Sequence, residues 1–314
     1  MTNLKKLGLT ALAGSLVATT GYAGALDISG AASVSYVSQD ETETTHNPFS
    51  MTRDITFSGS GEMDNGMTIS YFQLLSAGTF SSSGLTLDMG DAGKATFMNG
   101  ASGGHGISAY DDKMPTAGEQ VWDDTGADHG TPAEGIVNPR ADNTIEESLG
   151  YAVSMEGFTL STHASFGDGN GTEYSAVIAV DGLVDGLEVG AGLGNNWTAA
   201  TTEEDLETYY VKYATGPVTV GAQRSNIDRT AATTDIETTT YGISFAVNEN
   251  LSVSYGISDT DFEASASDEE NEGISASYTA GGATIGFVHN KKDNAVGTAN
   301  ADHETTELKL TFAF

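Results

Sequence analysis

The sequence contains no cysteine, only 5 prolines and only 12 lysines and arginines in 314 residues. The absence of cysteine excludes a disulfide scaffold, a thiol nucleophile and any metal or iron–sulfur site with cysteine ligands. The few basic residues stand against 44 aspartates and glutamates, which gives a formal net charge of -32. Because nucleic-acid binding needs clustered lysine and arginine, we expect no nucleic-acid partner.

The one extended apolar run lies at the N-terminus. Lys5 and Lys6 precede the apolar residues 7–20, and residues 21–23 (Gly-Tyr-Ala) place small side chains at the two key cleavage positions. This order predicts a secretory signal peptide over residues 1–23. An uncleaved anchor is the alternative, although the run is short for a membrane-spanning helix. The later sequence contains no run long enough for such a helix, so we expect an exported protein.

Residues 24–314, the predicted mature domain, alternate apolar and small polar residues. One face of a segment carries Leu251, Val253 and Tyr255, and the residues between them are serines. A period of two predicts strands with two different faces. The polar face is serine, threonine, glycine and a few charges, with no second set of large apolar side chains. A barrel with lipid outside and water inside explains both faces, and a secreted β-sandwich or solenoid adhesin is the alternative.

The predicted connections between strands are of two kinds. Seven short turns contain glycine, asparagine or proline, at residues 64–66, 90–93, 155–157, 181–186, 215–217, 248–250 and 280–282. Eight longer loops, mostly acidic and rich in threonine and serine, fall at residues 39–49, 76–84, 100–142, 167–173, 195–206, 225–237, 259–271 and 290–304. These connections predict sixteen antiparallel strands of about 8–12 residues, enough to cross a membrane when tilted. Short turns on one side and long loops on the other are typical of a transmembrane β-barrel, which must close because lipid cannot pair an open edge.

The last ten residues form an alternating strand that ends on Phe314. This segment resembles the terminal strand by which outer-membrane barrels are recognised for insertion. Four other stretches, at residues 24–30, 53–66, 93–97 and 143–145, complete a wider resemblance. Through these short motifs and its overall pattern, the mature chain resembles the Gram-negative general porins, particularly those of alphaproteobacteria.

That resemblance implies an all-β fold, a sixteen-stranded antiparallel barrel whose long third loop folds into the lumen as a constriction. It also implies a homotrimer in the bacterial outer membrane, in contact with lipid and lipopolysaccharide. Phe314 would be the insertion signal read by the barrel assembly machinery.

The connection at residues 100–142 is the longest, and loops of this length are usually functional or disordered. Its position matches the constriction loop of the family. It carries Asp111, Asp112, Glu119, Asp123, Asp124, Asp128, Glu134 and Asp142 against Lys113 and Arg140. An acidic constriction favours cations, so we expect a weak to moderate cation preference. The alternative is that most of these acids are simply solvated.

Family pores set such a loop against basic side chains on the barrel wall. The candidates here are Arg53, Lys94, Lys212 and Arg224. Lys212 has a clear lumen-facing phase, whereas Arg53 is in phase with Ile55 and is expected at a rim.

Metal sites have weaker support. Asp168, Asn170 and Glu173 loosely resemble a calcium-binding loop, and clustered oxygens suit Ca²⁺ or Mg²⁺. Such ions could bridge loops or lipopolysaccharide, but the complete spacing of a calcium loop is absent and solvated acids are the favoured interpretation. The six histidines show no close pairing, and His163 is expected to face the lumen. No cofactor is expected.

The sequence thus predicts a general diffusion porin that passes small hydrophilic solutes and ions through a water-filled pore, without catalysis. Two alternatives stay open, a substrate-selective porin and a non-conducting structural or adhesive surface barrel.

Overall fold

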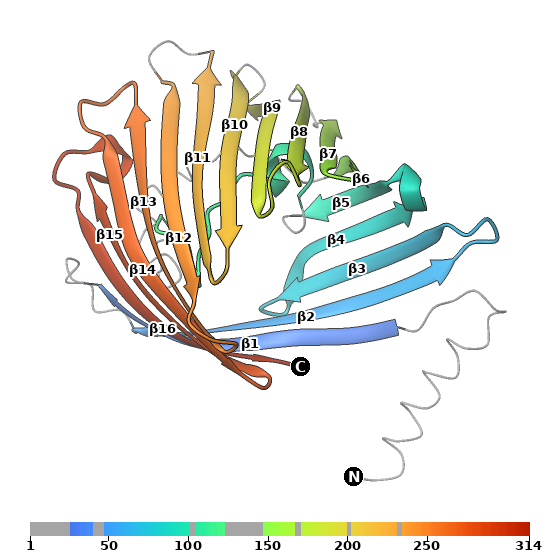
Figure 1. Ribbon diagram of the computed structural model, residues 1–314, viewed down its shortest axis with the longest axis horizontal. Coiled ribbons are helices and arrows are strands. Elements are labelled where there is room, and N and C mark those ends of the chain that lie inside the picture. The colour runs from blue at the N-terminus through green and yellow to red at the C-terminus, as the bar shows by residue number, and fades with distance from the viewer. Residues whose placement is uncertain are drawn as a thin grey trace, which may run out of the picture.

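The computed structural model describes residues 26–39, 47–100, 104–122, 147–166, 171–199, 202–230 and 234–314. Sixteen antiparallel strands follow one another in chain order and close into a barrel through β1 and β16 (Figure 1). The strands are β1 (Leu26–Gln39), β2 (Phe49–Glu62), β3 (Thr68–Ser76), β4 (Thr79–Asp88), β5 (Lys94–Gly100), β6 (Ser148–Met155), β7 (Phe158–Phe166), β8 (Thr172–Asp181), β9 (Leu187–Ala199), β10 (Thr202–Thr215), β11 (Val218–Arg229), β12 (Ile236–Ala246), β13 (Leu251–Phe262), β14 (Glu269–Ala280), β15 (Ala283–Asp293) and β16 (His303–Ala313). The predicted closed, sixteen-stranded antiparallel barrel is confirmed.

Helical structure is limited to single turns in the part of the chain that is described, at Gly90–Ala92, Gly106–Ala109 and Ala295–Gly297. No helix among these residues is long and apolar enough to cross a membrane. The predicted signal peptide at residues 1–23 lies outside the described residues.

The barrel closes at the C-terminal residue. The Gly30 backbone N–H donates to the Phe314 carbonyl oxygen at 2.8 Å, and the Phe314 N–H returns a bond to Gly30 at 2.9 Å. A Cβ atom at position 30 would lie 2.9 Å from the Phe314 ring, so the glycine makes room for that ring. The C-terminal phenylalanine is therefore part of the seam between β1 and β16.

The two faces of the wall differ as the alternation predicts. Large apolar side chains point outward and are exposed, such as Ile257 at 40% and Leu310 at 51%. The residues between them point inward and are small and polar, such as Ser258, which is buried. A soluble protein rarely leaves a continuous apolar surface uncovered, whereas a membrane barrel presents one to lipid. The arrangement gives an apolar outside and a polar inside.

The connection between β3 and β4 differs from the prediction. A long loop was expected at residues 76–84, but β3 ends at Ser76 and β4 begins at Thr79. Ala77 and Gly78 join them with φ of 50° and 87°, the geometry of a tight two-residue hairpin. The serines after this turn continue β4, where small polar side chains suit an inward face. The strands here are short, 9 residues in β3 and 7 in β5.

On the other side of the barrel, the strands run beyond their predicted ends. Much of the predicted loops at 195–206, 225–237 and 259–271 is strand, and β10 reaches 14 residues. The outward positions of these extensions carry acids instead of apolar residues, namely Glu207, Asp228, Glu237, Asp259, Asp261, Glu270 and Glu272. We refer to these seven residues as the outer acidic belt. The acid excess is thus not confined to loops.

Tyrosines lie along the edge of the outer acidic belt that borders the apolar outer surface. The Tyr209 hydroxyl donates to a Glu207 carboxylate oxygen at 3.2 Å, and the Tyr255 hydroxyl donates to Glu272 at 3.3 Å. Barrel proteins place aromatic side chains where hydrocarbon meets the polar region. These pairs indicate where the apolar outer surface ends.

Candidate functional site

Residues 104–122, which follow β5, lie against the inward-facing side chains of the wall; we refer to them as the inner segment. At its start the Gly106 N–H donates to the Ser161 hydroxyl at 2.9 Å, and the Ile107 N–H donates to the Ser175 hydroxyl at 3.0 Å. Ile107 is fully buried and packs in one cluster with Val177. Hydroxyls of β7 and β8 therefore satisfy the backbone where the inner segment begins.

Gln223 on β11 holds the middle of the inner segment with both ends of its amide. Its nitrogen donates to the Tyr110 carbonyl oxygen at 2.8 Å, and its oxygen accepts the Lys113 backbone N–H at 2.8 Å. Gln223 is buried, and its nitrogen also donates to Thr208 at 2.9 Å. A buried amide with these bonds satisfied stabilises one path for the segment.

Glycines in register make space for the segment further along. Gly221, Gly242, Gly256 and Gly273 are directly paired from β11 to β14. A Cβ at Gly221 would lie 2.8 Å from the Pro115 side chain, and one at Gly256 would lie 2.8 Å from Val121. We refer to these four residues as the glycine row. A larger residue at Gly221, Gly242 or Gly256 would compete with the inner segment for the same space, and one at Gly273 would meet Asn290, which bonds to the segment.

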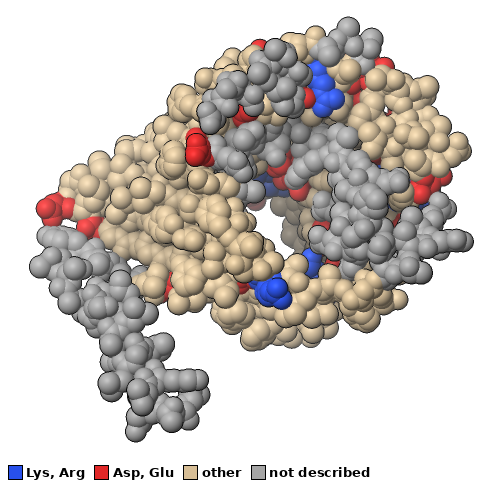
Figure 2. Space-filling model, turned by 180° about the vertical axis from the view of Figure 1, so that it is seen from behind, with Lys and Arg blue, Asp and Glu red and all other residues tan. Residues whose placement is uncertain are grey.

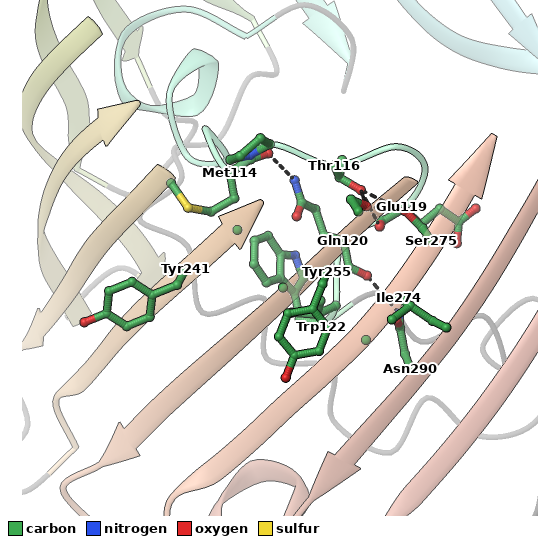
Figure 3. A pocket seen from close by; sticks show the side chains of 16 residues that line it. Met114, Thr116, Glu119, Gln120, Trp122, Tyr241, Tyr255, Ile274, Ser275 and Asn290 are labelled. Carbon is green, nitrogen blue, oxygen red and sulfur yellow. Dashed lines mark hydrogen bonds between the residues drawn. The ribbon is translucent and has the colours of Figure 1, made fainter. Parts of the chain in front are cut away.

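The far end of the inner segment reaches β13 to β16. The Ala117 N–H donates to the Ser254 hydroxyl at 2.9 Å. The Asn290 amide donates to the Gln120 carbonyl oxygen at 2.9 Å (Figure 3). The Lys309 ammonium donates to the Glu119 carboxylate at 2.8 Å. The cavity left between segment and wall is about 10 Å³, room for about one water. The segment is packed onto the wall along this stretch.

The remainder of the predicted constriction loop is outside the described residues. This applies to Asp123, Asp124, Asp128 and Arg140, and to Glu134 and Asp142. Among the predicted constriction acids, Asp111, Asp112 and Glu119 lie in the inner segment. That the loop as a whole narrows the lumen stays a prediction.

A charged and aromatic cluster forms where the inner segment crosses β9 and β10. Lys212 lies 2.9 Å from Glu188, which also accepts the Tyr210 hydroxyl at 2.8 Å. The Tyr210 ring stacks on Tyr110 with centroids 6.0 Å apart, and the Lys113 ammonium lies 4.3 Å from the Tyr110 centroid. Such a cation over an aromatic face is favourable.

Burial and then the nearby Lys212 ammonium lower the pKa of Lys113. Burial and then the Glu188 carboxylate raise the pKa of Tyr110. Burial alone lowers the pKa of His105, at the start of the segment. At neutral pH His105 is therefore uncharged and contributes nothing to the field in the lumen.

Ion pairs neutralise much of the inward-facing charge. Among the described residues, each inward-facing lysine or arginine of a strand lies within 4.0 Å of a carboxylate: Lys94 and Asp88, Lys212 and Glu188, Arg229 and Glu204, Lys292 and Glu269, and Lys309 and Glu119. Further inward-facing acids are Asp54, Glu173, Asp181 and Glu307. Counting Asp111, Asp112 and Lys113 of the inner segment, acids outnumber bases along the lumen. Figure 2 shows an opening through the molecule with both kinds of side chain at its edge.

Two of the four predicted wall candidates face away from the lumen, so that prediction is wrong for them. Arg53 pairs with Ala32 on the outward face, in phase with exposed Met51 and Ile55, as the alternation of β2 requires. Arg224 also points outward, because inward-facing Gln223 precedes it.

Arg224 pairs on that outer face with Glu237 and is half exposed. The other two candidates face inward, Lys212 at the cluster described above and Lys94 beside Asp88 at 3.0 Å. The opposing arginine cluster that the family resemblance implied is absent among the described wall residues.

Two calcium candidates, Asp168 and Asn170, lie outside the described residues. Glu173 is buried on the inward face of β8 and accepts the Trp197 backbone N–H at 3.3 Å. Among the described residues, no group of three or more histidines and acids is placed to hold a metal ion. His163 is buried on the inward face of β7, as expected.

Several inward-facing charges escaped the sequence interpretation, including Glu188, Glu204, Glu269, Lys292 and Glu307. Glu204, Glu269 and Lys292 stand within short runs of charged residues, and Glu188 and Glu307 stand between uncharged residues, so no local motif marks any of them as facing inward. Their phase is the available signal, because each alternates with an outward-facing neighbour.

Known proteins share features of this sequence and of this barrel. A family model described as Gram-negative porin matches residues 8–294. No curated protein sequence matches the chain. An anion-selective porin from Comamonas acidovorans shares 16% identity over 93% of this chain and 100% of that one, with a TM-score of 0.67.

Other solved structures are similar to the same degree. A trimer form of OmpT, an outer membrane protein of Vibrio cholerae, shares 12% identity over 93% of this chain and 100% of that one, with a TM-score of 0.65. A triple mutant of the Rhodopseudomonas blastica porin shares 12% identity over 92% of this chain and 100% of that one, with a TM-score of 0.66. With the family model covering most of the sequence, the chain belongs to the Gram-negative porins, the β-barrel proteins of the bacterial outer membrane.

Proposed function

We propose that this porin is a general diffusion channel with a weak preference for cations. The observation that carries the proposal is the lumen itself, whose wall is lined by serine, threonine and glycine and where acids outnumber bases. A polar wall suits hydrated solutes of many kinds. A net negative constriction lowers the barrier for cations and raises it for anions.

The inner segment is the filter in this proposal. Its backbone hydrogen bonds to β7, β8, β11 and β13 hold it against the wall, so we infer that it narrows the lumen from one side without closing it. Asp111, Asp112 and Glu119 then supply negative charge at the narrowest level. Size exclusion follows from the fixed segment, and charge preference follows from its acids.

We further propose that the protein works as a homotrimer, which the trimer form described for a structurally similar Vibrio cholerae protein supports. The outer acidic belt lies above the apolar surface, at the level expected for lipid headgroups. Divalent cations held there would link these carboxylates to the phosphates of lipopolysaccharide.

A liposome-swelling assay tests the general character of the channel. Purified protein is reconstituted into liposomes, and the rate of swelling is recorded for uncharged sugars of increasing size. A general channel gives rates that fall smoothly with solute size and do not saturate with concentration. Saturation or a strong preference for one sugar would contradict the proposal, and a complete lack of swelling would favour a structural or adhesive barrel.

The second candidate is an anion-selective channel, and one observation favours it. Within the described residues, Lys113 has no carboxylate at ion-pair distance, and Lys212 adds to the positive potential around it. The structurally similar Comamonas acidovorans porin is described as anion-selective. The sign of the reversal potential in a salt gradient separates the two candidates.

A further inference from the structure

Glu307 is a carboxylate in apolar surroundings on the inward face of β16. Its directly paired neighbours are Val37 on β1 and Val288 on β15, and all three side chains are at least nine-tenths buried. The Oε2 atom of Glu307 is buried and has no hydrogen-bond partner. Burying an ionised carboxylate without full hydrogen bonding is costly, so this group requires a proton or a nearby positive charge.

The side chain that meets Glu307 is another carboxylate. Glu119, in the inner segment, comes within hydrogen-bonding reach of it. Ionised carboxylates only accept hydrogen bonds, so the two can bond to each other only when one of them carries a proton. The contact between the inner segment and β16 is therefore sensitive to protonation.

Among the described residues, few other charges face this pair. Lys309, on the same strand, donates to Glu119 at 2.8 Å. On β1 the Ser35 hydroxyl comes within hydrogen-bonding reach of Glu307, and on β15 Asn290 donates to a backbone carbonyl of the inner segment. Lys292, also on β15, is engaged with Glu269 at 3.5 Å. With one proton on the two acids the group of Glu119, Glu307 and Lys309 is neutral, and without that proton it carries one negative charge.

We propose that Glu119 and Glu307 hold one proton between them, and that its release makes the pore more cation-selective. The inference rests on the proposed function, because it requires a conducting lumen. It makes Glu307 a selectivity-determining residue that acts through its charge at the end of the inner segment. At low pH the group adds no net charge to the lumen, and at high pH it adds one negative charge that attracts cations.

Reversal potentials across a range of pH test this inference. The full-length porin is placed in a planar lipid bilayer under a KCl gradient, and the pH is varied from about 5 to about 9, the range between free carboxylates and lysines. We expect the cation preference of the native protein to rise with pH along a single-proton curve. Glu307→Gln leaves Glu119 paired with Lys309 at every pH, so this step should disappear. Glu119→Gln removes the second carboxylate and leaves Glu307 buried beside Lys309, so the step should move to lower pH.

The control is Glu188→Gln on β9, a lumen carboxylate that pairs with Lys212 and stands opposite Asp181, outside the group of Glu119, Glu307 and Lys309. It should shift the reversal potential at every pH and keep the step. The inference is overturned if Glu307→Gln retains the step, if Glu119→Gln leaves the step at the same pH, or if the native protein shows none. Histidines that titrate in the same range, such as His105, would leave their step in both variants. Glu119→Gln lies in the inner segment, so it decides the matter even if Glu307→Gln does not assemble. A native protein without any conductance would instead contradict the proposed function.

Discussion

Glycine at positions 221, 242, 256 and 273 creates a shallow path across four strands, and the inner segment lies in it. A strand gains little from glycine, which has no side chain to pack and costs backbone entropy. The benefit here is the close approach of another part of the chain. Single residues thus decide whether a long connection has a defined position.

Replacing one glycine of the row tests this role. A Cβ at Gly242 would lie 3.0 Å from the Pro115 carbonyl oxygen, so Gly242→Val should displace the inner segment while the barrel still forms. Single-channel recordings should then show frequent current fluctuations in place of one steady open level. The control is Gly286→Val on β15, where the nearest atom to an added Cβ is 3.9 Å away. Equal steadiness in both variants would show that the row does not position the segment.

A lysine in the same region sets local charge. Lys212→Ala leaves Glu188 without its ammonium partner and adds one negative charge beside the inner segment. The cation preference should rise, measured as a larger reversal potential in a KCl gradient. Lys94→Ala frees Asp88 in a more exposed pair and should have the smaller effect, because water screens exposed charges better. The opposite order would place the selective point near Lys94.

At the scale of strands and connections, the hairpin between β3 and β4 departs from the simple alternation of short turns and long loops. The hairpin between β3 and β4 closes with two residues, and one of them, Ala77, has a left-handed backbone that alanine adopts poorly. Ala77→Asn should stabilise the folded barrel by about 1 kcal/mol, and Gly78→Ala should destabilise it by about 1–2 kcal/mol. Urea unfolding in detergent micelles measures both changes. If this connection were the long flexible loop expected from the sequence, neither substitution would alter the midpoint.

A second element is the strap formed by residues 294–302, which joins β15 to β16. Val296 packs against the apolar cluster of Ile227, Ile236 and Phe262, and its N–H donates to buried Glu269 at 2.8 Å. Glu269 also faces Lys292 at 3.5 Å.

Removing one partner of the buried pair of Glu269 and Lys292 should lower the free energy of unfolding. Glu269→Ala leaves the Lys292 ammonium buried without its carboxylate, so we expect a loss of about 3–5 kcal/mol in the free energy of unfolding. The double variant Glu269→Met with Lys292→Met should recover most of that loss, because no unpaired charge remains. A single variant as stable as the native protein would show that the pair is solvated.

At the scale of the whole molecule, the physical setting explains what the sequence could predict. Lipid outside and water inside impose a period of two on each strand, so strand number, closure and the outward apolar face follow from alternation. Alternation does not predict where the strands end. The strand segments that extend beyond the lipid carry acids such as Glu207 and Asp259, so their composition resembles that of a loop. The path of the inner segment depends on glycines and hydroxyls far apart in the sequence, which only the register brings together.

The charged side chains of the wall show the same difference between features that local sequence predicts and features that depend on long-range contacts. Arg53 is a wall candidate expected at a rim, but it lies on the outward face, which its phase with Ile55 explains because phase is a local property. The contact between Glu119 and Glu307 joins residues that are far apart in the sequence, and no local pattern marks it. The part of the filter that depends on long-range contacts therefore had to come from the structure.

The central claim is an open, water-filled pore whose acidic lumen favours cations. The most direct measurement is the current of the purified protein in a planar bilayer, first in symmetric KCl and then under a KCl gradient. We predict a steady ohmic conductance and a reversal potential with the sign of a weak cation preference. A reversal potential of the opposite sign, or a bilayer that stays closed after insertion, would contradict the account.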